Sequence, residues 1–344
     1  MKTQDFSQFK GELLSVALQK KSLVAATIEL TNVCNFKCKH CYLGDSKSCF
    51  LDVDIVKRII DELKELGCIM LLFTGGEPLL HPNFADIYIY AKLKGFIISV
   101  YTNGSLINSS HIALFKEYKP YLIEISLYGI DQPSYHSFTE VADSYNKVSD
   151  ALTSLSENNI SFRLKTMLIK HTYPFLSEMK KISQKYNVQF RWDSYIIPTL
   201  EGNTNILNDH LLEEDIMCSA ILEDDDRRNL IVSKIGVSVN KTKAQKLYIC
   251  DAGKTNVFIS AEAKMSMCVI ARDPWFDLNQ GSIKDGWSKL YSFSETLMPT
   301  DHPCFNCEKI QICRYCPSKF KLETGSINPV KRYCHIADKI IQKL

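Results

Sequence analysis

The residues best suited to chemistry in this 344-residue chain are its 13 cysteines, and most of them are clustered. Three lie within eight residues: Cys34, Cys38 and Cys41. Seven more lie in the last 95 residues: Cys250, Cys268, Cys304, Cys307, Cys313, Cys316 and Cys334. In a reducing compartment such clusters are typical of metal or cofactor ligands. The remaining three, Cys49, Cys68 and Cys218, are separate, and we expect them to be structural thiols.

Composition limits what these cysteines can be. The chain carries 41 basic and 39 acidic side chains, and 45% of its residues are hydrophobic, which excludes global disorder. The balanced charge gives no support for a nucleic-acid or membrane partner. No apolar run approaches the roughly 20 residues of a membrane span, and the N-terminus has no signal-peptide core. We therefore expect a cytoplasmic protein with reduced thiols rather than disulfides.

The first cysteine cluster has the spacing C-x3-C-x2-C and directly follows an apolar strand that ends near Leu30. Barrel and α/β enzymes place their chemistry at the carboxyl ends of strands. Three thiolates can hold three irons of a [4Fe–4S] cluster and leave the fourth iron open to another ligand. A structural zinc ion with His40 as fourth ligand is the alternative.

This stretch resembles the signature loop of the radical S-adenosylmethionine (radical SAM) superfamily, with His40 at the position that usually holds an aromatic residue. The resemblance extends to Gly75, Gly76 and Glu77 at the end of the second strand. In the superfamily this position holds the motif that contacts the methionine amino group of SAM. Glycines permit close backbone approach, and a carboxylate suits an ammonium group.

The resemblance also implies a SAM pocket and a mechanism. Ser126 lies in the region that binds the ribose of SAM in the superfamily, and Asn103 and Lys165 are further pocket candidates. The open iron would chelate the amino and carboxylate groups of SAM, and one electron would cleave the sulfonium into methionine and a 5′-deoxyadenosyl radical. That radical abstracts hydrogen from the substrate, while the protein positions the reactants and excludes water. A low-potential electron donor such as flavodoxin or ferredoxin is implied.

The C-terminal cysteines resemble the SPASM domain, an extension that carries auxiliary iron–sulfur clusters. The resemblance implies two of them, of the [4Fe–4S] type. The outer cluster would be ligated by Cys304, Cys307, Cys313 and Cys334. The inner one would be held by Cys250, Cys268 and Cys316. Its fourth ligand would be another residue, for which Cys218 is one option, or the substrate.

Two departures from the SPASM pattern affect loop geometry but remove no thiol. Ala263 replaces the usual glycine five residues before the second cysteine, and the last spacing, Cys313 to Cys316, is one residue shorter than the commonest form. A zinc knuckle formed by the four cysteines from Cys304 to Cys316 is the alternative, but it would leave three cysteines unexplained.

The elements that must position these residues alternate between strands and helices. Strands are predicted at 25–30, 69–73, 96–101, 121–127, 161–169 and 188–196. Helices are predicted at 53–66, 83–94, 109–118, 144–157 and 174–186. Alternation of this kind predicts parallel strands joined by crossovers, in either an open doubly wound sheet or a partial barrel. The resemblance implies an α/β fold: a partial (β/α)6 TIM-like barrel of the radical SAM type, plus a small cysteine-rich C-terminal domain.

The expected domains are an N-terminal extension (1–24), a radical SAM core (25–210), a polar linker (211–247) and the SPASM region (248–344). The last region shows little helical periodicity, and we expect its ligands rather than a large core to hold it together. About 25 residues before the first strand are too few for a fused peptide-recognition domain. The leader of a peptide substrate would then bind a separate protein, or recognition would be direct.

Many SPASM-bearing enzymes modify peptides or proteins, by crosslinking or by oxidation. The stretch 125–129, with Tyr135 and Thr139, is similar to members that mature ribosomal peptides, so we expect a peptide or protein substrate. A small-molecule substrate, such as a sugar alcohol or a porphyrin-type intermediate, is the first alternative. A non-catalytic iron–sulfur carrier or zinc-stabilised binding module is the second, but neither needs a SAM motif.

Candidate substrate-side residues are Tyr128, Arg191 and Asp193, all near strand ends. Asp193 could act as a proton acceptor in catalysis, and the alternative for it is a capping or paired carboxylate.

Overall fold

A computed structural model gives the fold and describes residues 6–44, 48–194, 196–235 and 245–344. Parts of the expected N-terminal extension (1–5), sixth strand (195) and linker (236–244) lie outside the described residues. None of the helices in the described part of the chain is both long and apolar enough to cross a membrane.

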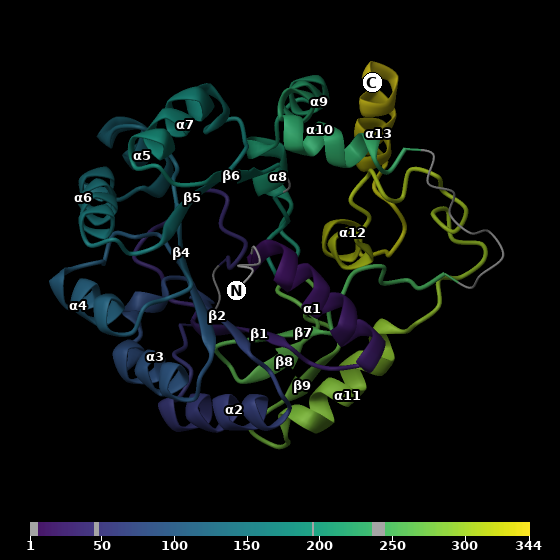
Figure 1. Ribbon diagram of the computed structural model, residues 1–344. Helices are drawn as coiled ribbons and strands as arrows, with labels where there is room; N and C mark the ends of the chain where they lie inside the picture. The colour runs from purple at the N-terminus through teal and green to yellow at the C-terminus, as the bar shows by residue number, and fades with distance from the viewer. Residues whose placement is uncertain (1–5, 45–47, 195, 236–244) are drawn as a thin grey trace.

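Six parallel strands form the main sheet, as the sequence predicts. They are β1 (Ala25–Thr31), β2 (Met70–Gly75), β3 (Ile97–Thr102), β4 (Leu122–Ser126), β5 (Phe162–Met167) and β6 (Phe190–Asp193). They are hydrogen-bonded in the order β6-β5-β4-β3-β2-β1, so neighbours in sequence are neighbours in the sheet. Figure 1 shows the sheet curved, with its helices on the outer side. The partial barrel is therefore confirmed.

The outer helices are α2 (Val53–Glu65), α3 (Phe84–Leu93), α4 (Ser109–Glu117), α5 (Gln132–Thr139), α6 (Ser144–Glu157) and α7 (Leu176–Lys185). In α2, Val56, Ile59, Ile60 and Leu63 recur at helical spacing and are fully buried against the sheet. Helix α5 was not predicted, because its eight residues are too few for a clear periodicity. Its start is fixed instead by a capping box of Asp131 and Ser134.

The two faces of the sheet differ in chemistry. Ile98, Val100, Ile123, Ile125 and Leu164 point toward the helices and are fully buried in the hydrophobic core. Since side chains alternate along a strand, the residues between them lie on the inner, concave face, and many of these are polar or charged. The inner face is therefore equipped for binding rather than for packing.

The C-terminal region continues this sheet. Strand β7 (Asn256–Ile259) pairs parallel with β1, and β8 (Lys264–Ser266) and β9 (Trp275–Asp277) follow antiparallel, giving nine strands in the described residues. Three helices follow: α11 (Ile283–Ser294), α12 (Pro317–Thr324) and α13 (Lys331–Lys343). The expectation of a region with little helix, held by its ligands rather than by a core, is wrong. Its buried residues, such as Val257 and Ile340, belong to the same hydrophobic core as the barrel.

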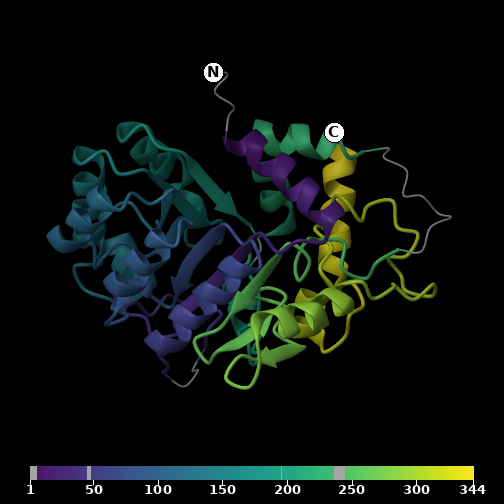
Figure 2. The same cartoon turned by 60° about the horizontal axis from the view of Figure 1, so that its bottom comes forward.

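Helices α1 (Phe6–Lys20), α8 (Asn205–His210), α9 (Glu214–Glu223) and α10 (Asp225–Val232) were also not predicted. The polar composition of 211–235 concealed a buried face in α9, formed by Met217, Cys218 and Ile221. The Cys218 thiol donates to the Ile336 carbonyl of α13 over 3.6 Å, so α9 packs against α13. Figure 1 and Figure 2 place α12 and α13 on the opposite side of the molecule from α3 to α7.

Candidate active site at the carboxyl ends of the strands

The first cysteine loop leaves β1 at Thr31, whose hydroxyl accepts from the Val33 amide (3.0 Å) and donates to the Cys49 carbonyl (2.7 Å). The Cys34, Cys38 and Cys41 thiols interact electrostatically with one another. Burial raises the pKa of each, that of Cys34 to about 11. Iron binds thiolates, so loading this loop must release protons.

The glycine pair at the end of β2 lies directly against the cysteine loop. The Gly76 and Glu77 amides donate to the Thr31 and Val33 carbonyls over 2.7 and 2.8 Å. A Cβ atom on Gly76 would lie 2.3 Å from the Val33 carbonyl oxygen, and one on Gly75 equally close to that of Thr31. The glycines therefore allow the close backbone approach that the sequence predicted, and the partner in the structure is the cysteine loop itself.

The Glu77 carboxylate is fully buried and accepts three hydrogen bonds from the protein. Its donors are the Thr102 hydroxyl (2.7 Å), the Asn103 amide (2.7 Å) and the Leu79 amide (3.1 Å). Burial raises the pKa of Glu77 to about 7. The side chain predicted to meet an ammonium group thus ties the end of β3 to the end of β2.

Asn103 links the end of β3 to the cysteine loop. Its side-chain amide donates to the Asn35 side-chain oxygen (2.8 Å) and to the Cys34 sulfur (3.8 Å). Ser105 donates back to the Asn103 side-chain oxygen over 2.7 Å. Sequence reasoning missed Asn35 and Ser105. The only available signal was that both are polar and lie one or two positions from predicted site residues.

An aromatic group flanks the loop. The His40 ring lies 5.1 Å from the rings of Tyr128 and Phe138, measured between centroids. Burial lowers the pKa of His40 to about 3, so its imidazole is neutral, and burial raises the pKa of Tyr128. The buried His40 Nδ1 has no hydrogen-bond partner among the described residues. Buried polar atoms are almost always paired, so this orphan atom fits a site that receives a polar ligand.

Ser126 and Lys165 lie side by side across β4 and β5 on the inner face of the sheet. The Lys165 Nζ is 4.0 Å from a Glu124 carboxylate oxygen, and burial lowers the pKa of Lys165. The structure therefore places all the predicted SAM-pocket residues at or just below the carboxyl ends of β2 to β5, beside the cysteine loop.

Asp193, at the end of β6, forms an ion pair with Arg314 over 2.7 Å. Arg314 lies in the loop between Cys313 and Cys316, so this pair connects the edge of the barrel to the C-terminal cysteines. Asp193 is a paired carboxylate in this structure, which is the alternative that the sequence left open for it.

The seven C-terminal thiols fall into two groups of electrostatically interacting side chains. One group is Cys250, Cys268 and Cys316. The other is Cys304, Cys307, Cys313 and Cys334. The SPASM resemblance implies the same two groups. Ligation itself belongs to the proposal below.

The surroundings of both groups suit clusters. The buried Tyr315 hydroxyl has no partner among the described residues and interacts with Cys304, Cys313 and Cys316. In the described part of the chain, no three Cys, His, Asp or Glu side chains converge as they would on a single metal ion. An iron–sulfur cluster keeps its thiolates apart, each on its own iron, so separated thiols with a nearby hydroxyl donor fit one.

The three separate cysteines lie elsewhere. The electrostatic neighbours of Cys218 are charged residues of α9 and α13, so it does not complete the inner group. Cys68 is fully buried, and the Cys49 thiol donates to the Ala261 carbonyl over 3.1 Å.

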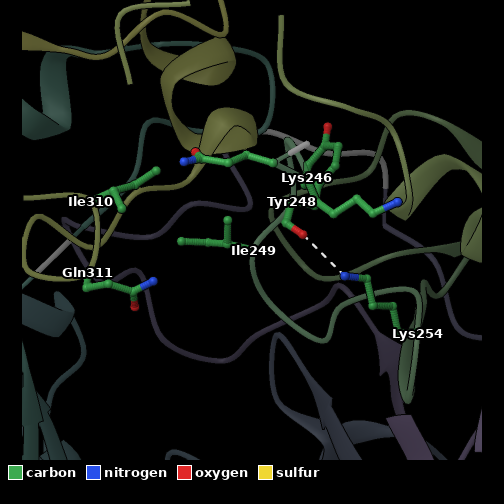
Figure 3. A pocket seen from close by; sticks show the side chains of 7 residues that line it. Lys246, Tyr248, Ile249, Lys254, Ile310 and Gln311 are labelled. Carbon is green, nitrogen blue, oxygen red and sulfur yellow. Dashed lines mark hydrogen bonds between the residues drawn. The ribbon is translucent and has the colours of Figure 1, made fainter. Parts of the chain in front are cut away.

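A cavity of about 270 Å³ is lined in part by residues that flank Cys250 in the sequence (Figure 3). Its lining comes from the segments on both sides of Cys250 and from the loop between Cys307 and Cys313: Gln245, Lys246, Tyr248, Ile249, Lys254, Ile310 and Gln311. Figure 3 shows the Lys254 ammonium donating to the Tyr248 carbonyl. Since no predicted SAM-pocket residue lines it, this cavity is separate from the strand ends.

Comparison with known proteins gives a family and several relatives. Residues 28–176 match the sequence model described as the radical SAM superfamily. The chain is 35% identical over 142 residues to the antilisterial bacteriocin subtilosin biosynthesis protein AlbA of Bacillus subtilis, which covers 40% of this chain and 32% of AlbA. It is 25% identical over 193 residues to the AdoMet-dependent heme synthase of Nitratidesulfovibrio vulgaris, covering 54% and 50% of the two chains. The heme synthase of Methanosarcina barkeri is 20% identical over 330 residues, covering 89% and 94%.

Two solved structures share the fold over most of the chain. SuiB of Streptococcus suis, bound to its precursor peptide SuiA, has a TM-score of 0.69 at 17% identity and covers 95% of this chain and 80% of SuiB. The structure of native anSMEcpe with bound AdoMet has a TM-score of 0.68 at 16% identity and covers 93% of this chain and 96% of anSMEcpe. By sequence, the chain spans half or less of AlbA and of the N. vulgaris heme synthase.

Proposed function

Residues 28–176 belong to the radical SAM superfamily, and on this basis we propose that the protein is an enzyme that cleaves S-adenosylmethionine and modifies a peptide substrate by radical chemistry. The observation that carries the proposal is the contact between the cysteine loop and the glycine pair of β2 at the carboxyl ends of the strands. Both motifs of the family are thus held against each other by backbone hydrogen bonds.

Cys34, Cys38 and Cys41 would hold a [4Fe–4S] cluster. When bound, the cluster supplies one electron that cleaves SAM into methionine and a 5′-deoxyadenosyl radical, which takes a hydrogen atom from the substrate. A low-potential donor such as flavodoxin or ferredoxin would deliver that electron.

The protein's own residues would orient and protect these groups. Gly75 and Gly76 fix the end of β2 against the loop, and Asn103 donates to the Cys34 sulfur. His40 and Tyr128 would cover one side of the pocket and exclude water. Ser126 and Lys165 would bind SAM from the inner face of the sheet.

The C-terminal groups would carry two auxiliary [4Fe–4S] clusters. Four thiols would close the outer one, while the inner group has three, which leaves one iron for another ligand. The Asp193–Arg314 ion pair lies between this region and the barrel, so the inner cluster would be close to the substrate side of the site.

A peptide substrate is supported by the relatives. AlbA takes part in the biosynthesis of a bacteriocin, SuiB was solved with a precursor peptide, and anSMEcpe was solved with a peptide as well as AdoMet. We therefore propose post-translational modification of a ribosomal peptide by crosslinking or oxidation.

A porphyrin-type substrate is the second candidate. It is favoured by the alignment with the M. barkeri heme synthase, which extends over nearly the whole of both chains. The heme synthase is 20% identical to this chain, compared with 35% for AlbA, so the porphyrin-type substrate is the less favoured of the two candidates.

SAM cleavage is tested with the anaerobically reconstituted enzyme, SAM and dithionite, with 5′-deoxyadenosine measured by liquid chromatography. The wild type should form it, and Cys34→Ala, Cys38→Ala and Cys41→Ala should each abolish it. Cys218→Ala, which changes a thiol between α9 and α13, should retain it. Undiminished product in any of the first three variants would defeat the assignment.

The substrate class is tested by co-expression with short open reading frames from the same genomic neighbourhood, followed by mass analysis of each peptide. A mass change that depends on Cys34 supports peptide modification. Unchanged peptides, together with conversion of a porphyrin by the purified enzyme, would favour the second candidate.

A further inference from the structure

The inner face of the barrel gathers cations where β4, β5 and β6 lie side by side. Tyr101, Glu124 and Arg163 are register partners across β3, β4 and β5. Ser126, Lys165 and Arg191 are register partners across β4, β5 and β6. Register partners in parallel strands point to the same face, so these side chains form two adjacent rows.

One buried carboxylate forms ion pairs with three of these cations. Glu124 is 2% exposed and accepts from the Arg163 Nε over 2.6 Å. The Arg191 guanidinium lies 3.4 Å from the same carboxylate, and the Lys165 ammonium 4.0 Å. Arg163 also donates to the Tyr101 hydroxyl over 3.1 Å. A single carboxylate cannot neutralise three cations.

Two further arginines join this group from outside the barrel strands. Arg227 of α10 lies 3.7 Å from the centroid of the Trp192 ring and interacts electrostatically with Arg191, Asp193 and Arg314. Arg314 pairs with Asp193. The cation cluster therefore consists of Arg163, Lys165, Arg191, Arg227 and Arg314. Among the residues that the structure describes, the anions that face it are Glu124, Asp193 and Asp224.

This imbalance is costly unless an anion binds. Like charges in a partly desolvated site repel more strongly than in water. Neutralisation by SAM is not sufficient, because SAM carries one carboxylate but also an ammonium and a sulfonium group. Arg191 is the accessible member on the strands, with 41% of its side chain exposed. An anionic group arriving at the open edge of the sheet would meet it first.

We propose that the cation cluster is a subsite for a carboxylate of the substrate, with Arg191 and Arg314 as its accessible members. This rests on the proposed function and adds the chemical class of the substrate: it carries at least one acidic group near the reacting position. The carboxylate has two sources among the candidate substrates, an acidic side chain of a peptide or a carboxylate arm of a porphyrin.

The test measures binding to the anaerobically reconstituted holoenzyme by calorimetry. The first probe is an acetylated and amidated hexapeptide with two glutamates, compared with its glutamine counterpart. The second is coproporphyrin III, compared with its tetramethyl ester. At least one of the two acidic probes should bind roughly tenfold more tightly than its neutral counterpart. This ratio is the effect expected for one charge-assisted hydrogen bond. Which acid is preferred identifies the source.

Arg191→Gln should lose most of this preference, and Arg191→Lys should keep part of it. The matched control is Arg228→Gln on α10, which is 44% exposed and pairs with Asp225. It should leave the preference unchanged. Equal binding of acid and neutral forms in both pairs would overturn the subsite, as would equal effects of Arg191→Gln and Arg228→Gln.

Iron content and circular dichroism check that each variant folds. Formation of 5′-deoxyadenosine without substrate is measured in parallel. A wild type that prefers acids but cleaves no SAM would defeat the proposed function and leave the subsite standing. A wild type that cleaves SAM but binds acidic and neutral probes equally would defeat the subsite and leave the proposed function standing.

Discussion

At the scale of single residues, His40 shows how a substitution within a motif changes the chemistry of a pocket. A phenylalanine at this position would offer only a ring, whereas His40 also offers two nitrogens that can form hydrogen bonds. The structure keeps the ring packed against Tyr128 and Phe138 and leaves Nδ1 buried without a partner among the described residues. The neutral imidazole can form a hydrogen bond without bringing a charge into the pocket.

We predict that His40→Phe weakens SAM binding about 5-fold and leaves the fold intact. The aromatic packing is kept, and only the hydrogen bond to the ligand, worth about 1 kcal/mol, is lost. Equilibrium dialysis of the reconstituted enzyme with labelled SAM measures the effect. His136→Phe, at an exposed position of α5, is the control and should change nothing. Equal affinity in His40→Phe and the wild type would show that Nδ1 does not contact SAM.

Residue roles could be predicted from the sequence only where a motif or a resemblance to a family implies them. The division of the C-terminal cysteines into two groups is what the SPASM resemblance implies, and in the structure the thiols interact within the same two groups. The partners of Glu77 could not be predicted, because its hydrogen bonds cross from β2 to β3 and depend on how the strand ends are stacked. The same holds for Asn35 and Ser105.

At the scale of elements, the end of β2 is the tightest junction in the site. Gly76→Ala would place a methyl group 2.3 Å from the Val33 carbonyl oxygen, and backbone on both sides prevents an easy shift. We predict a loss of roughly 1–3 kcal/mol in unfolding free energy, as for overpacked cores, together with reduced iron loading of the first loop. Thermal melting and iron analysis measure these effects.

Gly11→Ala is the matched control for that substitution. Nothing lies within 4 Å of a Cβ on Gly11, which is in α1, so alanine there should raise helix stability by about 0.5–1 kcal/mol. If Gly76→Ala melted at the wild-type temperature with full iron content, the junction would be looser than the structure indicates.

The turn between β7 and β8 gives a second prediction for an element. Ala263, where the SPASM pattern has glycine, adopts a left-handed conformation with φ of 58° and donates to the Ser260 carbonyl. Left-handed backbone costs a non-glycine residue roughly 1–2 kcal/mol, and glycine would relieve this strain. About half of the gain is offset because glycine has more conformational freedom to lose from the unfolded chain. Ala263→Gly should therefore raise stability by about 0.5 kcal/mol, and Ala263→Val should lower it by roughly 2 kcal/mol.

Differential scanning fluorimetry under anaerobic conditions checks this turn. Ala91→Gly, at a buried position with ordinary helical backbone in α3, should destabilise the protein, so a stabilising Ala263→Gly cannot be a general effect of glycine. A destabilising Ala263→Gly would mean that the buried methyl group matters more than the backbone strain.

Among the elements, those with strong periodicity or buried runs could be predicted. All six barrel strands were predicted, and helix α6 has the predicted bounds, because each buries one face on the sheet. Strands β7 to β9 were missed because they have three or four residues each and are stabilised by pairing to β1 and to one another. Helix α9 was missed because it has only ten residues and lies in a polar stretch that conceals its short buried face. Helix α10 was missed because none of its residues is buried, so its sequence carries no apolar periodicity.

At the scale of the whole molecule, the three cysteine groups predict the iron content. Full reconstitution should load about 12 irons, four for each cubic cluster. Replacing Cys34, Cys38 and Cys41 together by alanine should leave about eight, and replacing Cys304 and Cys307 should also leave about eight. Iron and sulfide analysis with Mössbauer spectroscopy distinguishes these species. A wild type with about four irons would contradict the auxiliary clusters.

A buried lysine gives a prediction for the auxiliary clusters themselves. Lys319 is 4% exposed, lies 3.6 Å from the centroid of the Tyr333 ring, and interacts electrostatically with Cys313 of the outer group and Cys316 of the inner group. Burial lowers the pKa of Lys319 to about 8. A cation beside a cluster stabilises its more negative, reduced state. Lys319→Met should therefore shift the reduction potentials of the auxiliary clusters to more negative values.

Redox titration followed by electron paramagnetic resonance measures this shift. The potential of the cluster in the first loop should not change. Lys321→Met, which removes an exposed ammonium paired with Asp273, should leave all three potentials unchanged. If Lys319→Met and Lys321→Met gave the same potentials, the charge of Lys319 would not act on the clusters.

The pairing of β7 with β1 has a consequence for any attempt to divide the protein. Removing residues 248–344 would strip one side of β1 of its hydrogen-bonded neighbour and uncover apolar core residues. Uncovered strand edges pair readily with other chains. A truncated barrel would thus tend to self-associate, and its loss of activity would reflect aggregation rather than the absence of auxiliary clusters. Point substitutions of the cysteines, which leave the sheet closed at this side, are the way to separate the two.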